Sequence, residues 1–149
     1  MKKSLTFVVA ALVMISAFTG CEKGDTTGTY SMTANIGGTP VAFDNSLVNV
    51  VSKPITGTVS YVIQGLNNQK SYPYIYIYIP TNTTGTYSIG GYGSPVYAIY
   101  AVDTLTTKYS NSGSLVFAAG FPLATGAYSF TCTDGTVISS GSFSAKGLN

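Results

Sequence analysis

Few side chains in this sequence could carry out chemistry. The 149-residue chain contains no histidine, and its only cysteines are Cys21 and Cys132. Without histidine the usual general base at neutral pH is missing, which excludes Ser-His-Asp and Cys-His pairs and histidine-ligated zinc or iron sites. Two cysteines are also too few for a metal site built from cysteines alone.

Carboxylates are scarce as well. Asp44, Asp103 and Asp134 are the acidic residues of the part of the chain that we expect to fold. A glycosidase needs two carboxyl groups at a fixed separation, and no spacing in the sequence brings Asp44 together with Asp103. Calcium takes about six to eight oxygen ligands, and the sequence has no acidic cluster. We therefore expect no enzyme activity, no metal and no cofactor, while a hydrolase that uses Asp44 or Asp103 stays open as an alternative.

The most regular pattern is "SYPYIYIYIP" (71–80), in which tyrosine alternates with isoleucine. Successive side chains of a β-strand point to opposite faces, so an extended strand separates the two sets. One face carries Tyr72, Tyr74, Tyr76 and Tyr78, and the other carries Ile75, Ile77 and Ile79. Isoleucine has no polar group to satisfy, whereas each buried phenol needs a hydrogen-bond partner. We therefore predict that the isoleucines face the core and that the tyrosines face outward or into a cavity.

The tyrosine face has two interpretations. Because tyrosine combines a large apolar ring with a polar tip, the face could stack sugar rings or aromatic groups, or form one wall of a ligand cavity. It could equally be the solvent-facing side of an ordinary sheet, where tyrosine pairs with cross-strand neighbours such as Tyr61, Tyr97 or Thr58. The high β-propensity of tyrosine favours the second interpretation.

Cys132 ends the segment "GAYSFTC" (126–132). Alternation places its thiol on the same face as Tyr128 and Phe130. A free thiol on an apolar face usually behaves as a small core residue. We predict a buried structural thiol and not a nucleophile.

The N-terminus has the three parts of an export signal. Lys2 and Lys3 precede an apolar stretch that is too short to span a membrane, and small residues follow it. The segment "FTGC" (18–21) resembles the lipobox of bacterial lipoproteins, with phenylalanine where leucine is commonest. This resemblance implies that residues 1–20 are removed and that the Cys21 thiol receives a diacylglycerol. The alternative is a plain secretory signal with an incidental cysteine.

Lipidation would anchor the mature chain to a membrane without spanning it. Two or three acyl chains such as palmitate hold a protein on a membrane stably. Residues 21–28 are polar and small, as expected of a tether. Glu22, Lys23 and Asp25 resemble the surface-export signal of Bacteroidetes lipoproteins. We expect an outer-membrane location, with periplasmic and surface-facing orientations both open.

The charge of the mature chain is close to zero. Removal of Lys2 and Lys3 with the leader leaves as many lysines as acidic residues, and the chain has no arginine. A nucleic-acid partner needs a clustered basic face, so we expect none.

Residues 29–149 read as one all-β domain. Turn residues recur at spacings of about 8 to 12 residues, and no helical period of useful length appears, which favours a β-sandwich or a barrel and leaves the choice between them open. Beyond the leader, no apolar run approaches the roughly 18 residues of a membrane-spanning helix. About ten short strands are expected. Their segments are "TYSMTANI", "TPVAF", "SLVNVV", "GTVSYVIQG", "SYPYIYIYIP", "TYSI", "VYAIYAV", "GSLVFAA", "GAYSFTC" and "GSFSAK".

The C-terminal part resembles the ending of a family of Bacteroidetes lipoproteins of unknown function. In that family a glycine-x-aromatic strand, an Asn/Asp-Gly turn and a Gly-x-Phe strand close an antiparallel sheet. The matching residues are Gly126, Tyr128 and Phe130, then Asp134 and Gly135, then Gly141 and Phe143. The resemblance implies a location and a fold, but no activity.

A further short motif concerns modification. Asp103-Thr104-Leu105 resembles the acceptor sequence for protein O-glycosylation in Bacteroidetes, and Asp25-Thr26-Thr27 is a looser match. The resemblance implies a glycan on Thr104.

These observations together predict a lipid-anchored cell-envelope β-domain that acts as a non-enzymatic binding or structural module. Its expected partners are the membrane, through the lipid, and a glycan or a protein. The alternative is a small β-barrel that carries an apolar or glycan ligand, with tyrosines lining its mouth.

Overall fold

Ten β-strands make up the fold, in a computed structural model that describes residues 30–52, 59–67, 72–120 and 122–147. The strands are β1 (Ser31–Ile36), β2 (Thr39–Phe43), β3 (Asn45–Ser52), β4 (Val59–Leu66), β5 (Tyr74–Ile79), β6 (Gly85–Ile89), β7 (Tyr97–Ala101), β8 (Thr107–Ala119), β9 (Leu123–Cys132) and β10 (Val137–Gly147). Each corresponds to one segment expected from the sequence, so the prediction of an all-β domain is confirmed.

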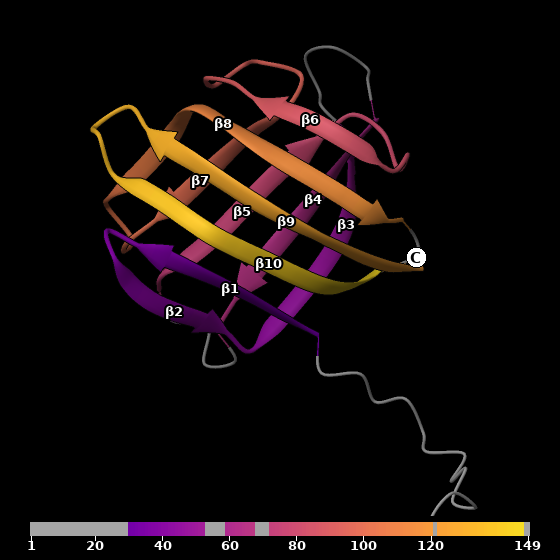
Figure 1. The fold of residues 1–149 in the computed structure, drawn as a ribbon, viewed down its shortest axis with the longest axis horizontal. Coiled ribbons are helices and arrows are strands. Elements are labelled where there is room, and N and C mark those ends of the chain that lie inside the picture. The colour runs from indigo at the N-terminus through magenta and orange to yellow at the C-terminus, as the bar shows by residue number, and fades with distance from the viewer. Residues whose placement is uncertain (1–29, 53–58, 68–71, 121, 148–149) are drawn as a thin grey trace, which may run out of the picture.

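Seven of the strands close into a barrel. Hydrogen-bonded neighbours follow the order β10-β3-β4-β5-β7-β8, and β9 completes the ring by pairing with both β8 and β10. Every pair is antiparallel except β10–β3, whose parallel contact joins Lys146 to Leu47 and Gly147 to Val48. In Figure 1, β8, β9, β10 and β1 lie in front, and β3, β4, β5 and β7 cross behind them. Of the two architectures that the sequence left open, the structure is the barrel.

The remaining three strands extend the wall of the barrel. The hairpin of β1 and β2 is added to β10, and β6 is added to β8. This is accommodated because β8 and β10 are long and change partner along one edge. On β8, Thr107–Tyr109 pairs with β7, and Gly113–Phe117 pairs with β6. The polar start of β8, "TKYSNS", has little hydrophobic alternation, which is why the sequence predicted a shorter strand.

Ser110 lies where β8 changes its partner strand from β7 to β6. Its side chain is fully buried. The Ser110 hydroxyl donates a hydrogen bond to the carbonyl of Gly90 (2.6 Å) and accepts one from the amide of Ala98 (2.8 Å). The hydroxyl therefore pairs two backbone groups at the edge of β8 where its pairing with β7 ends and its pairing with β6 has not begun.

The barrel interior is filled with apolar side chains. Ile75, Ile77 and Ile79 on β5 are each 0% exposed, which confirms that the isoleucine face is the core face. They belong to one cluster with side chains from the other barrel strands, including Leu115 and Phe130. A barrel of about eight strands is just wide enough for side chains to fill, and this seven-stranded ring follows that rule.

Two glycines make room for aromatic rings between β9 and β10. Gly126 pairs with Phe143, and Tyr128 pairs with Gly141. A Cβ on Gly126 would lie 2.6 Å from the Phe143 ring, and a Cβ on Gly141 would lie 2.5 Å from the Tyr128 ring. Each glycine-x-aromatic motif therefore places its aromatic ring over the glycine of the other strand. This reciprocal packing gives a physical reason for the motif.

Gly141→Ala is expected to lower the free energy of unfolding by about 1–3 kcal/mol, because the added methyl group forces the buried Tyr128 ring to move. Urea denaturation followed by circular dichroism measures the change. Ser144→Ala, half-buried on the same strand, is the control and should stay within about 0.5 kcal/mol of the parent chain. Equal stability of the parent chain and Gly141→Ala would contradict the packing described.

Candidate functional site

The residue on which the lipid prediction depends lies outside the described part of the chain. Cys21 and the tether 21–28 precede residue 30, where the description begins, so lipidation stays a prediction. Among the described residues, no helix is long and apolar enough to cross a membrane.

The tyrosines of β5 gather on the outside of the barrel. Tyr72, Tyr74, Tyr76 and Tyr78 are all half-exposed, opposite the buried isoleucines. The rings of Tyr72 and Tyr74 have centroids 5.0 Å apart, and those of Tyr74 and Tyr76 stack at 4.6 Å with an interplanar angle of 27°. The Tyr74–Tyr76 stack therefore covers one face of each of these two rings.

Three further tyrosines continue this surface across β7 and β8. Tyr78 stacks on its cross-strand partner Tyr97 at 4.4 Å and 8°. Tyr92, from the turn between β6 and β7, makes edge-to-face contacts with Tyr97 (5.4 Å, 75°) and with Tyr109 of β8 (4.8 Å, 62°). The side chains of Tyr72, Tyr74, Tyr76, Tyr78, Tyr92, Tyr97 and Tyr109 form what we call the tyrosine surface. Tyr97 is only 7% exposed and belongs to it as the ring that Tyr78 and Tyr92 contact.

Sequence reasoning found only part of this surface. Tyr97 was expected as a cross-strand neighbour and is one, whereas Tyr61 faces inward and packs against the core; Thr58 lies outside the described residues. Tyr92 and Tyr109 were missed. Tyr109 sits opposite Ile99 of β7, a register that no local pattern reveals, and Tyr92 lies in "GGYGSP", which reads only as a break between strands.

Burial and crowding keep these phenols protonated. The pKa of Tyr97 is raised to about 12, chiefly by burial and then by its neighbours Tyr78, Tyr92 and Tyr109. Burial, followed by neighbouring phenols, also raises the pKa values of Tyr74, Tyr76 and Tyr78. The hydroxyl groups of these four tyrosines therefore remain uncharged hydrogen-bond donors and acceptors well above neutral pH.

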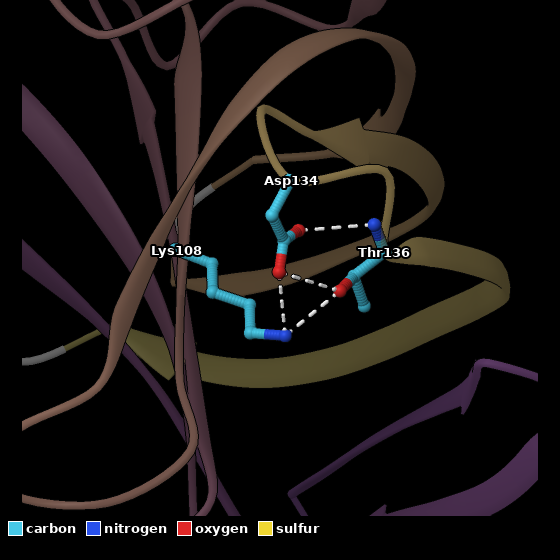
Figure 2. Close-up of polar contacts among 3 residues, drawn as sticks. All are labelled: Lys108, Asp134 and Thr136. Carbon is cyan, nitrogen blue, oxygen red and sulfur yellow. Dashed lines mark hydrogen bonds and ion pairs between the residues drawn. The ribbon is translucent and has the colours of Figure 1, made fainter.

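An ion pair joins β8 to the turn between β9 and β10. Lys108 at the start of β8 reaches the turn between β9 and β10, where its Nζ lies 2.7 Å from Asp134 Oδ2 and donates to Thr136 Oγ1 at 2.8 Å (Figure 2). The Thr136 amide and hydroxyl both donate to the Asp134 carboxylate. The pKa of Asp134 is lowered to about 2, chiefly by the Lys108 hydrogen bond and then by those from Thr136. The Asp134 carboxylate therefore stabilises the turn between β9 and β10.

Cys132 is a core residue, as predicted. It is free, 2% exposed, and shares its buried face with Tyr128 and Phe130. Burial and the nearby Asp134 carboxylate raise the thiol pKa to about 11, against a smaller opposing effect of Lys108. Because the thiolate is the nucleophilic form, this thiol is poorly suited to nucleophilic chemistry.

Thr104 occupies the exposed turn between β7 and β8. Asp103 Oδ1 accepts hydrogen bonds from the amides of Leu105 (2.8 Å) and Thr106 (2.7 Å), which lower the pKa of Asp103. Leu105 is 94% exposed. The motif is thus accessible to a modifying enzyme, and O-glycosylation of Thr104 stays a prediction that the mass of its peptide tests. Asp25-Thr26-Thr27 lies outside the described residues.

The acidic residues with described positions lie in separate parts of the fold. Asp44 lies between β2 and β3, and the carboxylate of Asp103 is bonded within its own turn. Among the residues that the structure describes, no group of three or more His, Cys, Asp or Glu side chains could hold a metal ion.

A small groove lies at the β1–β2 hairpin. It has a volume of about 240 Å³ and is lined by residues of β1 and β2 and by Ser140. Ser140 has a φ of +51° at a bulge where the β10 register shifts between Ile138 and Gly141. The lining contains hydroxyl and amide groups but no acid or base, so the groove offers hydrogen bonds and no acid–base chemistry.

No protein-family model, curated protein or solved structure matches this chain. The chain is therefore assigned to no family. The structure supports only the fold that the resemblance implied: the chain forms a small all-β domain with a seven-stranded mixed barrel.

Asp134→Asn is expected to remove a pH-dependent contribution to stability. The carboxyl pKa is about 2 in the folded chain and about 3.9 in an unfolded one, so the ionised form stabilises the fold above the unfolded pKa, and this contribution is lost as the pH falls through the folded value. The melting temperature of the parent chain should exceed that of Asp134→Asn near neutral pH, and the difference should shrink from about pH 5 to about pH 2.

Thermal unfolding at a series of pH values measures this difference. Asparagine keeps one oxygen that can accept a turn hydrogen bond, but its NH2 group cannot accept the bonds made to Oδ2. The part of the difference that varies with pH therefore reports the charge. Lys108→Gln removes the largest cause of the lowered pKa and should flatten the pH dependence. A difference between parent and variant that stays constant from neutral to acid pH would contradict the role of the ion pair.

Proposed function

We propose that this chain is a lipid-anchored, non-enzymatic binding module of the bacterial cell envelope and that the tyrosine surface is its contact surface. The observation that carries the proposal is the gathering of seven phenols on the outside of the barrel. Tyrosine is enriched where proteins meet ligands because its ring gives contact area and its hydroxyl gives hydrogen bonds at a low cost in conformational entropy.

The sequence supports the anchor and the location. The "FTGC" segment and its leader match the pattern of lipidated export signals, and the resemblance to Bacteroidetes lipoproteins points to the outer membrane. The nine residues between Cys21 and Ser31 can span at most about 30 Å. A diacylglycerol on Cys21 would therefore keep the barrel close to the membrane, with its tyrosine surface available to envelope components.

The packed interior favours a binding module over a carrier. Carriers hold their ligand in a cavity lined mostly by apolar side chains. Here the inward residues Ile63, Ile77 and Leu115 are all 0% exposed and pack in one cluster. The tyrosines of β5 face outward instead of lining a mouth.

The state of the acids supports a non-enzymatic role. Asp134 is paired with Lys108, and Asp103 accepts hydrogen bonds from its own turn. The buried thiol of Cys132 has a raised pKa. These are the arrangements of structural groups, because a catalytic acid or nucleophile needs access to a substrate and a pKa suited to its task.

Cys21→Ala is expected to abolish lipidation and membrane attachment. Cells that express the chain are labelled with palmitate analogues and fractionated. The parent chain should carry the label and sediment with membranes, and Cys21→Ala should do neither, because only a thiol can form the thioether. Cys132→Ala is the matched control and should keep both properties. A Cys21→Ala chain that still carries the label would contradict the anchor.

Tyr92 should be protected in the envelope if the tyrosine surface is occupied there. Isolated envelopes and the detergent-purified full chain are acetylated with N-acetylimidazole, and modification of each tyrosine is measured by mass spectrometry. Tyr92, 70% exposed, should react less in envelopes. Tyr87 on β6, whose hydroxyl is bonded to the Thr83 carbonyl, should react equally in both and is the internal control. Equal reaction of Tyr92 in both samples would contradict the proposed contact surface.

A further inference from the structure

We propose that the tyrosine surface binds a neutral glycan, with the exposed ring of Tyr92 stacking on a sugar ring and the phenol hydroxyls of β5 hydrogen-bonding to sugar hydroxyls. This inference rests on the proposed function and names the class of ligand. It follows from the charge of the surface, the orientation of its rings, the setting of Tyr92 and the place of the exposed aliphatic side chains.

The tyrosine surface carries no formal charge in the part of the chain that the structure describes. The strands beside β5 contribute neutral outward side chains, among them Gln64 of β4 and Ile99 of β7. Asp44, Asp103 and Asp134 lie between strands, and Lys146 lies on β10. Lys108 precedes Tyr109 on β8, but its Nζ is paired with Asp134 in the turn between β9 and β10. An uncharged surface offers nothing to the phosphates or carboxylates of an anionic polymer, so its ligand is neutral.

The half-exposed tyrosines of β5 carry phenol hydroxyls at alternate positions along one strand. Because Tyr74 and Tyr76 stack on each other, one face of each ring is covered, and the phenol hydroxyls become the more important groups for a ligand. A phenol hydroxyl both donates and accepts hydrogen bonds, as each sugar hydroxyl does. Gln64 lies opposite Tyr76 in the register of β4 and β5 and adds an amide with a donor and an acceptor. This row suits a ligand with hydroxyl groups along its length.

Tyr92 supplies the exposed ring that the stacks lack. The turn that carries it is held by hydrogen bonds from Gly90 N to Val96 O and from Ser94 N to Gly91 O, and Gly93 adopts a φ of +92° that suits glycine. The ring is 70% exposed, yet it rests against Tyr97 and Tyr109. A ring placed in advance loses little freedom on binding, and its apolar face can pack against the C–H groups of a sugar.

The position of the exposed aliphatic residues favours a glycan over a protein or a bilayer. Among the described residues, the large aliphatic side chains with high exposure lie outside β4, β5 and β7; they are Leu105 in the turn after β7, Val116 on β8, Leu123 on β9 and Val137 on β10. A protein interface core and a bilayer surface both depend on burying apolar area. Beside the tyrosine rings, Ile99 of β7 is only half-exposed. Hydroxyl-tipped rings with so little exposed aliphatic area around them match a polyhydroxylated partner better.

The test uses the full chain, purified in a polyoxyethylene detergent that has no sugar headgroup. Isothermal titration is carried out with maltohexaose, cellohexaose, xylohexaose and mannohexaose as neutral probes, with polygalacturonate as an anionic probe, and with phosphatidylethanolamine vesicles. At least one neutral oligosaccharide should bind, with an affinity that does not change between about 0.05 and about 0.5 M salt, because no ion pairs are formed. Polygalacturonate and vesicles should not bind.

Variants locate the binding. Tyr92→Ala should weaken the neutral oligosaccharide about tenfold or more, and Tyr92→Phe should keep most of the affinity because the ring is retained. Leu105→Ala removes an even more exposed apolar side chain that is not part of the tyrosine surface, and this variant should bind as the parent chain does. Circular dichroism of each variant checks the fold.

Several results would overturn the inference. These are binding of none of the neutral oligosaccharides, binding of polygalacturonate or vesicles in their place, or unchanged affinity in Tyr92→Ala. If Tyr92 is nevertheless protected from acetylation in envelopes, the proposal of a glycan ligand is wrong, but the proposal that the tyrosine surface is a contact surface is not. If Tyr92 reacts equally in envelopes and in detergent, the proposed function itself is wrong.

Discussion

The barrel wall is a single layer of β-strands, so the side chains of each strand are divided between a packed interior and the outside. On β5 this division is complete: Ile75, Ile77 and Ile79 are fully buried, and the tyrosines between them are not. The physical reason is the phenol hydroxyl, which costs free energy inside a dry core unless it finds a partner. Tyr128 shows the exception, because it lies inside the barrel and donates a hydrogen bond to the Thr33 carbonyl at 3.0 Å. The tyrosines therefore lie on the outer face of β5 because the isoleucines fill the core.

The rest of the fold brings separate tyrosines together. β7 places Tyr97 directly beside Tyr78, and the partner change of β8 at Ser110 brings Tyr109 and the β6–β7 turn to the same region. On the other side of the ring, the glycine–aromatic pairs let β9 and β10 approach closely, and two residues of β10 close the barrel against β3. Residues that are far apart in the sequence thus meet in one uncharged surface. Other titratable side chains have structural roles: Lys108 and Asp134 form an ion pair, and Cys132 lies in the core.

Alternation and turn residues were enough to predict every strand, because both are local properties of the chain. The same local reasoning predicted the core side of β5 and the buried state of Cys132. It could not predict the length of β8, whose polar first half is stabilised by pairing with β7 and not by an apolar face. Nor could it predict that the sheet closes, since the parallel contact between β10 and β3 depends on residues about a hundred positions apart. Tyr109 joins the site through a similarly distant register and Tyr92 through a turn, so these two members of the candidate surface could not be predicted from the sequence.

The central claim is that the outward tyrosines form a contact surface while the inward ones hold the core. The most direct measurement is a nuclear magnetic resonance titration of the full chain with isotope-labelled tyrosine rings, in which neutral oligosaccharides are added stepwise. The account predicts that the ring signals of Tyr74, Tyr76 and Tyr92 shift together, while those of Tyr128 in the core and Tyr87 on β6 do not. Shifts confined to Tyr128 or Tyr87, or no shift of the outward tyrosines, would contradict it.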